Sequence, residues 1–387
     1  MKISLCMIVK NEEKYIKMCL ENAMKLADEA VIVDTGSTDK TKEIIKDFDK
    51  NIKIIDYKWD DDFSKARNVS IENATGDWIL MMDADEKLLC NPDKVRKILE
   101  KPEFEGYKVP LYNITNANMI IFSSVYTKLF KNNKEYRYSG RIHEQLNIPN
   151  LGDTKAEMPK EISKIIHYGY LDSVVKERDK AGRNLRILKK QLKEMPNDPF
   201  VHYNIGVSYQ VQGKNEEALK HFFKCNELWR KKDLYGVTLY EIDMTKRIAE
   251  SLVKLGKYDE CIDMLKNILN DDVYKGFVDL EYIEGMCYYF KKDYKKAVSC
   301  FEKCTEMGDT NKFISVLGMG SYKAKEMMAR CYVELKDELK AINAFMESIF
   351  DPNNFMHEGL NDFRIYLKKN NRIEILNQLN KLVSNNN

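Results

Sequence analysis

Short apolar runs alternate with amphipathic segments along the first 170 residues. Four runs are apolar at nearly every position and predict strands at residues 3–9, 30–33, 52–57 and 78–82. The segments between them show helical spacing and predict helices over residues 11–25, up to residue 48, and 64–73. Apolar strands that alternate with helices indicate a sheet of parallel strands covered on both faces. Ligands of such sheets bind at the carboxyl ends of the strands.

The fourth apolar run leads directly into two aspartates, in the stretch WILMMDADEKL that begins at Trp78. Asp83 and Asp85 are separated by one residue, so in an extended segment their side chains project to the same side. Like charges this close repel each other. Either the pair lies in water and has no special role, or a cation belongs between the two carboxylates.

From about residue 196 the pattern becomes entirely helical, and a repeat appears. Gly206, Ala249, Gly285 and Ala329 each begin a similar series of small, aromatic or large apolar, and alanine or cysteine positions. The offsets resemble those of tetratricopeptide repeats, although the steps between units exceed the usual ~34 residues and predict longer connections. An unrelated helical bundle is the alternative. We expect residues 360–383 to form a capping helix.

The two halves predict three segments: an α/β domain over residues 1–171, a linker helix over 172–195 and a helical repeat domain over 196–387. The linker is strongly basic, and we interpret it as a solvated charged helix that joins the domains. The run Asp60-Asp61-Asp62 is interpreted in the same way, as a solvated loop.

The overall composition limits the class of protein. The 387 residues carry 63 basic and 61 acidic side chains, so the formal net charge of +2 gives no reason to expect nucleic acid as a partner. The nine cysteines form no CxxC pair, which indicates small hydrophobic residues in a reducing compartment. No signal-peptide pattern and no apolar run long enough for a membrane helix is present, so we expect a cytoplasmic protein.

Four motifs in this order resemble those of family 2 glycosyltransferases, which have the GT-A fold. They are CMIVKNEE from Cys6, VIVDTGSTDKT from Val31, FSKARN from Phe63 and MDADE from Met82. Two later motifs, GRIHE from Gly140 and IHYG from Ile166, resemble a subgroup fused to tetratricopeptide repeats, which includes S-glycosyltransferases of bacteriocin peptides. The resemblance implies a Rossmann-like mixed sheet, as in nucleotide-diphospho-sugar transferases, over residues 1–170.

The resemblance also implies a metal site for the diphosphate of a sugar nucleotide. Asp85 and His167 correspond to ligands of Mn²⁺ or Mg²⁺, and Asp83 to a residue that contacts the ribose or reaches the metal through water. Both ions prefer oxygen ligands and keep substrate phosphates, so few protein ligands suffice. An EF-hand is excluded, because the stretch lacks the third ligand, the turn glycine and the bidentate glutamate. A packed or surface histidine is the alternative for His167.

The nucleotide is expected to lie against residues from several motifs. By resemblance, Asp34 bonds the base, the backbone around Val9 and Asn11 lines the same pocket together with Ala84, and Arg67 lies near the base or the diphosphate. The alternatives are a helix N-cap for Asp34 and a surface salt bridge for Arg67.

A catalytic pair is expected at His143-Glu144, where related enzymes carry an acidic catalytic residue. Transfer with inversion needs one general base that deprotonates the acceptor, and a carboxylate suits this role. We expect Glu144 to be the base, with His143 as the alternative, because the pair departs from the more common Glu-Asp.

These features predict a metal-dependent, inverting hexosyltransferase that uses a UDP-sugar such as UDP-glucose or UDP-N-acetylglucosamine. The repeats are expected to bind a peptide or protein acceptor, or a second protomer as a homodimer. Two alternatives remain: transfer to a cell-envelope polysaccharide or lipid-linked glycan, and a non-catalytic repeat scaffold with a decayed transferase domain.

Overall fold

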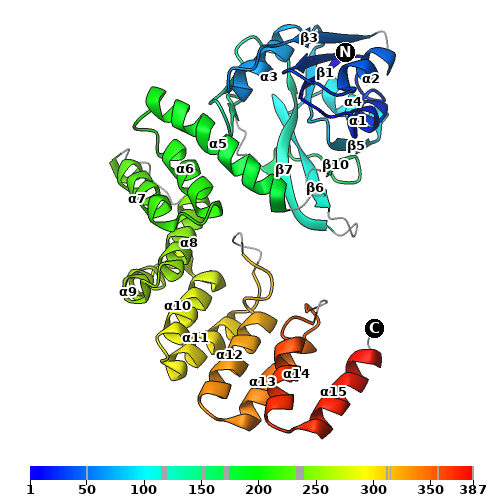
Figure 1. The fold of residues 1–387 in the computed structure, drawn as a ribbon. Coiled ribbons are helices and arrows are strands. Elements are labelled where there is room, and N and C mark those ends of the chain that lie inside the picture. The colour runs from blue at the N-terminus through cyan, green and yellow to red at the C-terminus, as the bar shows by residue number, and fades with distance from the viewer. Residues whose placement is uncertain are drawn as a thin grey trace. The chain divides into compact units, whose positions relative to one another are not determined.

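A computed structural model describes residues 1–48, 51–114, 120–149, 154–168, 174–231, 239–310, 313, 315–354 and 357–385. The chain divides into two compact units, Met1–Pro196 and Asn197–Asn387, and each is described by itself (Figure 1). The basic helix α5 (Val174–Glu194), expected as a linker, lies within the first unit.

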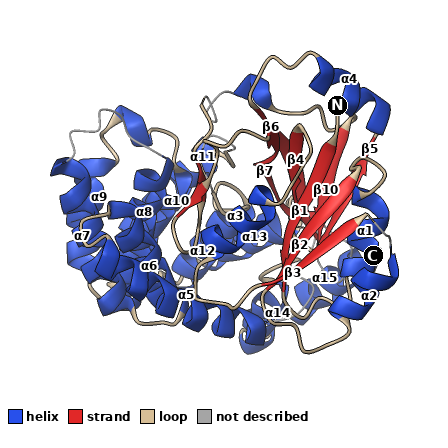
Figure 2. Cartoon of the chain, turned by 90° about the horizontal axis from the view of Figure 1, so that it is seen from above, coloured by secondary structure: helices blue, strands red, loops and turns tan. Residues whose placement is uncertain are grey.

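Unit 1 is built on an eight-stranded mixed sheet in the order β3-β2-β1-β4-β7-β6-β10-β5, whose strands lie side by side in Figure 2. The strands are β1 (Ile3–Val9), β2 (Glu29–Asp34), β3 (Ile52–Asp56), β4 (Trp78–Met81), β5 (Glu86–Cys90), β6 (Gly106–Ile114), β7 (Ile120–Lys131) and β10 (Ser163–His167). A separate pair joins β8 (Tyr138–Ser139) and β9 (Gln145–Leu146). The four strands predicted from the apolar runs, β1 to β4, are mutually parallel as expected, whereas β7 and β5 run antiparallel to their neighbours. The mixed sheet implied by the resemblance is confirmed.

The apolar runs are explained by burial on both faces of the sheet. In β1, Ile3, Leu5, Met7 and Val9 face one core, which also contains α1 (Ile16–Ala23), α2 (Thr41–Phe48) and α4 (Pro92–Glu100). Cys6 of the same strand lies in a second core with Ile71 of α3 (Phe63–Glu72). Successive side chains of a strand point to opposite faces, so a strand between two layers must be apolar at every position.

The strand directions bring distant loops to one edge of the sheet. β1, β2, β3 and β4 are mutually parallel, and β4 is related to β6 through the antiparallel strand β7. Strand β10 runs parallel to β6, so it ends at the same edge as β4. His167 at the end of β10 pairs with Glu86 at the start of β5. The residues that follow β1, β2 and β4 therefore meet His167 at this edge.

The helix expected over residues 11–25 begins later than predicted, at Ile16. Asn11 has a left-handed backbone with φ of 57°, which prevents a helix from starting there. Its amide N–H donates to Ser37 Oγ, and its side-chain oxygen accepts from the N–H of Thr38. Asn11 thus ties the loop after β1 to the loop after β2.

Unit 2 consists of helices that pack against their neighbours along the chain, in successive pairs (Figure 1). The described helices are α6 (Pro199–Val211), α7 (Asn215–Lys231), α8 (Leu239–Lys254), α9 (Tyr258–Ile268), α10 (Val278–Phe290), α11 (Tyr294–Met307), α12 (Tyr322–Glu334), α13 (Glu338–Ile349), α14 (Leu360–Lys369) and α15 (Ile373–Asn385). Two η turns, Thr154–Ala156 in unit 1 and Asp272–Tyr274 in unit 2, complete the described elements.

The repeat signature reflects close packing within each helix pair. A Cβ placed on Gly206 would lie 2.5 Å from the ring of Phe222, and one on Gly285 would lie 2.8 Å from the ring of Phe301. Both rings are fully buried. The small residue of the first helix therefore makes room for the aromatic ring of the second.

The single capping helix expected over residues 360–383 is wrong, because the segment forms the pair α14 and α15. Asn371 has a positive φ of 55° between the two helices, and the N–H of Arg372 donates to the carbonyl of Leu367. Phe363 and Leu379 lie in a core shared with Phe345 of α13, so this last pair buries its apolar face against the preceding one.

Replacing Gly206 by alanine tests this packing. The new methyl group would meet the buried Phe222 ring, so we expect a loss of about 1–3 kcal/mol of stability, seen as a lower midpoint of thermal unfolding. Gly182→Ala is the matched control, because this helical glycine has open space around its Cβ position. The control should gain about 0.5–1 kcal/mol from helix propensity. Equal midpoints for the two variants would contradict the packing argument.

Candidate active site

The two aspartates lie in the turn between β4 and β5, at the sheet edge described above. The turn is held by its backbone: the carbonyl of Asp83 accepts from Cys19 Sγ at 3.5 Å and from the N–H of Glu86 at 3.1 Å. The carbonyl of Asp85 accepts from the N–H of Tyr168 at 3.0 Å. Contacts from α1 and from the end of β10 therefore fix the direction of both carboxylates.

His167 lies against Asp85, as the prediction of a shared site requires. Its Nε2 is 3.3 Å from Asp85 Oδ2, and its Nδ1 is 2.6 Å from Asn113 Oδ1. Burial favours the neutral ring, but the contact with Asp85 raises the pKa of His167 above its ordinary value. The amide of Asn113 fixes the orientation of the imidazole, which is a common arrangement behind a metal-binding histidine.

Asp83 is turned toward a different partner, Arg67 of α3. Arg67 Nη2 donates to Asp83 Oδ1 at 2.9 Å, and Arg67 Nε donates to Glu144 Oε1 at 2.6 Å. The side chains of Arg67 and Glu144 are each only 13% exposed. This is a partly buried network that joins two predicted site residues, so the alternative of a surface salt bridge for Arg67 is wrong.

A buried ion pair supports the same turn from β7. Lys128 Nζ lies 2.7 and 2.8 Å from the two carboxylate oxygens of Glu86, and Glu86 Oε2 accepts from the N–H of Asp83. Burial alone would lower the pKa of Lys128, but the carboxylates of Glu86 and Asp83 raise it. For Asp83 burial opposes ionisation, yet the charges of Arg67 and Lys128 bring its pKa far below the usual range. Asp83 is therefore ionised.

A cavity of about 410 Å³ opens at this edge, a size typical of small-molecule sites. Five groups of residues line it, from the end of β1, the end of β2, the loop before α3 with α3 itself, the β4–β5 turn with His167, and α5. They are Ile8, Val9, Lys10, Glu12, Thr35, Trp59, Phe63, Arg67, Asp83, Ala84, Asp85, His167, Arg183 and Arg186. Val9, Arg67, Asp83, Ala84, Asp85 and His167 were all predicted site residues, and the structure brings them together.

Two predicted nucleotide contacts do not line this cavity directly. Asp34 is buried, and its carboxylate accepts from the N–H groups of Gly36 and Ser37 at 3.1 and 3.0 Å. Asn11 is exposed and ties the neighbouring loop, as described above. Both residues shape the loops beside the cavity. The alternative role of Asp34 as a helix N-cap is wrong, because α2 begins only at Thr41. Its carboxylate instead holds the turn at Gly36 and Ser37.

His143 and Glu144 lie on the segment between β8 and β9 and reach the site through their neighbours. Glu144 touches the site through Arg67. His143 has a positive φ of 54° and is exposed. Surrounding protein atoms and the charge of Arg183 lower the pKa of His143, against the opposing effect of Glu144. Its ring is therefore neutral at neutral pH.

Three parts of the site were missed by sequence reasoning. Lys128 is a charge set directly before the apolar residues Leu129 and Phe130 of β7, and that was the signal for a buried partner. The expected solvated loop Asp60-Asp61-Asp62 is wrong: Asp61 and Asp62 are buried, Asp61 pairs with Arg186 and Lys190, and Asp62 caps α3. The basic helix α5 is also no purely solvated linker, since Arg183 and Arg186 line the cavity.

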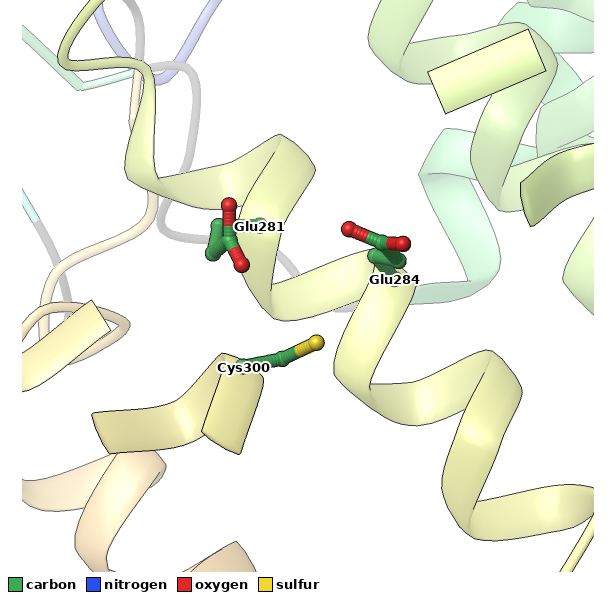
Figure 3. Close-up of side chains that lie close together, drawn as sticks. All are labelled: Glu281, Glu284 and Cys300. Atoms are coloured by element: carbon green, nitrogen blue, oxygen red, sulfur yellow. The ribbon is translucent and has the colours of Figure 1, made fainter. Parts of the chain in front are cut away.

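One further cluster among the described residues has the side chains of a metal site. Figure 3 shows the thiol of Cys300 on α11 pointing toward the carboxylates of Glu281 and Glu284 on α10. Glu281 already pairs with Lys303 at 3.1 Å. Burial and the neighbouring carboxylates raise the pKa of Glu284 and of the Cys300 thiol, which disfavours the ionised forms that bind a metal. We interpret it as a structural contact between α10 and α11.

The fold and the site define an α/β domain of the nucleotide-diphospho-sugar transferase type, joined to helical repeats. Residues 4–165 match the family described as Glycosyl transferase family 2, and residues 282–307 match a tetratricopeptide repeat family. The chain therefore contains a family 2 glycosyltransferase domain of the GT-A type followed by tetratricopeptide repeats. Across the described residues, no helix is long and apolar enough to cross a membrane.

Two curated relatives match both halves in part. A TPR repeat-containing protein of Synechococcus elongatus is 34% identical over 229 residues, which are 58% of this chain and 56% of that protein. The SPbeta prophage-derived glycosyltransferase SunS of Bacillus subtilis is 28% identical over 296 residues, which are 73% of this chain and 66% of SunS. The chain thus spans 56% and 66% of the lengths of these relatives. Among solved structures, one similar chain is YrrB, which is described as a TPR protein with an unusual peptide-binding site. The match covers 48% of this chain and 84% of the YrrB chain, at 18% sequence identity and a TM-score of 0.35.

The Lys128–Glu86 pair is open to a direct test. Lys128→Met leaves a buried carboxylate without its cation, so we expect a loss of about 3–5 kcal/mol of stability in chemical denaturation. Adding Glu86→Gln in the same chain should recover most of this loss, because no buried charge then lacks a partner. Lys42→Met removes an exposed ion pair with Asp56 and serves as the control. We expect it to leave the midpoint of chemical denaturation unchanged. A double variant no more stable than Lys128→Met would show that the pair does not act as a unit.

Proposed function

We propose that this protein is a metal-dependent, inverting glycosyltransferase that moves a hexose from a UDP-sugar, such as UDP-glucose or UDP-N-acetylglucosamine, to a peptide or protein side chain. The observation that carries the proposal is the cavity at the carboxyl edge of the sheet, in which Asp83, Asp85 and His167 meet. Its size suits a nucleotide sugar, and its position is where open α/β sheets bind ligands.

The residues present fit Mn²⁺ or Mg²⁺. Asp85 Oδ2 and His167 Nε2 are 3.3 Å apart, which is close to the spacing of two atoms that bind one ion at about 2.0–2.2 Å. A site with two protein ligands leaves positions for phosphates and water, as Mg²⁺ prefers. When bound, the ion supplies a Lewis acid for the negative charge that develops on the departing diphosphate.

The other residues of the cavity are assigned to the ribose, to the base and to an apolar wall. Asp83 is held ionised by Arg67 and Lys128 and is hydrogen-bonded to Arg67, whereas Asp85 contacts His167, which supports the assignment of Asp83 to the ribose. The loops fixed by Asn11 and Asp34 form the side of the cavity assigned to the base. Trp59 and Phe63 stand edge to face with ring centroids 4.8 Å apart and give this region an apolar wall.

The general base is assigned to Glu144, with His143 as the alternative. Glu144 Oε1 accepts from Arg67, and within the described part of the chain Oε2 has no hydrogen-bond partner, so it is open to take the proton of an acceptor thiol or hydroxyl. His143 is neutral and exposed, so its lone pair is the competing proton acceptor.

The acceptor is assigned to a polypeptide because of the repeats. Polar side chains that are buried or half-buried gather on the first helices of successive pairs, where Tyr203, Gln210, Asp243 and Arg247 form one network across α6 and α8. Such a face suits the backbone and side chains of a peptide, with a second protomer as the alternative occupant. The described cysteines are all free, which fits a cytoplasmic site of action.

The metal assignment is tested by Asp85→Ala. We expect hydrolysis of UDP-glucose or UDP-N-acetylglucosamine in the presence of Mn²⁺ to fall by about 100-fold or more, because the charge on the diphosphate loses its counter-ion. Release of UDP, followed by chromatography with and without added metal, measures the effect.

Asp47→Ala, an exposed aspartate on α2, is the matched control and should leave hydrolysis unchanged. Circular dichroism checks that each variant is folded. If the parent chain neither binds nor hydrolyses any UDP-sugar with either metal, the enzymatic proposal is refuted. Transfer to envelope glycans but to no peptide would refute the acceptor.

The base is tested by two nearly isosteric variants. Glu144→Gln keeps an acceptor for Arg67, and His143→Asn suits the left-handed backbone, since asparagine tolerates positive φ. Loss of the true base should lower kcat for acceptor transfer by about 10²–10⁴-fold with little change in donor KM. Near-normal transfer by Glu144→Gln, together with loss in His143→Asn, would reassign the base to His143.

A further inference from the structure

Helix α5 contributes two cations to the cavity that holds Asp83 and Asp85. Arg183 and Arg186 both line it. The guanidinium of Arg183 lies 5.4 Å from the ring centroid of Phe63, which lines the same cavity. One wall of the cavity is therefore acidic, and another, built by a helix about a hundred residues later in the chain, is basic.

The two arginines differ in how far their charge is already neutralised. Arg186 Nη2 donates to Asp61 Oδ1 at 2.9 Å, while Lys190 Nζ lies 2.5 Å from Asp61 Oδ2. The same carboxylate accepts from Trp59 Nε1 at 3.0 Å. These contacts lower the pKa of Asp61 to about 2, so the carboxylate stays charged and holds α5 in place.

Arg183 carries a charge that lacks a carboxylate partner among the described residues. Within the described part of the chain, its guanidinium donates only to the side-chain oxygen of Asn184. Burial and the nearby Arg186 lower the pKa of Arg183, which is the response of a cation that its surroundings do not compensate. An anion in the cavity would remove this penalty.

We propose that Arg183 binds the diphosphate of the sugar nucleotide. This assignment rests on the proposed function. The diphosphate of a sugar nucleotide carries two negative charges and gains a third as the sugar leaves, so the departing nucleoside diphosphate carries more negative charge than one divalent ion neutralises. A planar guanidinium bonds two phosphate oxygens at once. Asp85 and His167 hold the diphosphate through the ion from the sheet, and Arg183 holds it directly from α5. Arg186, already paired with Asp61, sets the position of the helix.

The test compares nucleotides with their nucleosides. Calorimetric titrations of the full chain with UDP, GDP, ADP and dTDP, and with the matching nucleosides, are made with and without Mn²⁺. Arg183→Gln should weaken the tightest-binding diphosphate by about 10- to 100-fold, as expected for one lost charge-assisted contact, and leave the nucleoside unaffected. Arg183→Lys should give an intermediate loss, since lysine keeps the charge but not the planar geometry.

Lys193→Gln removes the same charge from an exposed position of the same helix and should not change binding. Diphosphate binding by Arg183→Gln equal to that of the parent would overturn the assignment and leave the proposed function intact. An equal loss for diphosphate and nucleoside, or a loss confined to acceptor KM, would also overturn it. A parent chain that binds no nucleoside diphosphate would overturn both.

Discussion

Three carboxylates stand within four residues where β4 turns into β5, and their mutual repulsion is the constraint that organises the site. Two like charges 4 Å apart near a protein surface repel by about 4 kcal/mol. Each carboxylate takes a different partner: Arg67 for Asp83, Lys128 for Glu86 and His167 for Asp85. Only the partner of Asp85 is a titratable ring rather than a fixed cation. This division leaves Asp85 as the carboxylate most available to an ion.

The partners also explain why the domain needs its particular sheet. Arg67 comes from the helix before β4, Lys128 from the strand beside β4, and His167 from a strand that reaches the same edge by a long connection. Antiparallel β7 places Lys128 beside the start of β5, where a purely parallel sheet would need a further crossover. The mixed topology is thus linked to neutralisation of the turn.

The sequence predicted the parts of this arrangement that depend on local pattern. The strands before Asp34 and Asp83 are apolar on both faces, so their alternation with helices and their polar ends were visible without a structure. The identities of Asp83, Asp85 and His167 followed from motif order. The ion-pair partners could not be predicted in this way, because Lys128 pairs with Glu86 across strands and Arg186 pairs with Asp61 over a separation of 125 residues. No periodicity encodes such contacts, so a charged loop and a charged helix looked merely solvated.

The pairing of Asp61 with α5 changes what the basic helix contributes. A cation on a freely moving helix would lose side-chain and backbone entropy on binding a phosphate. Asp61 instead binds Arg186 and Lys190 before any ligand arrives, and its hydrogen bond from Trp59 ties the helix to the apolar wall of the cavity. Arg183 lies one turn earlier on the same helix, so its position is set by contacts that a nucleotide need not provide. The two arginines three residues apart therefore differ in their contacts: Arg186 anchors the helix through Asp61, and Arg183 lines the cavity without a carboxylate partner among the described residues.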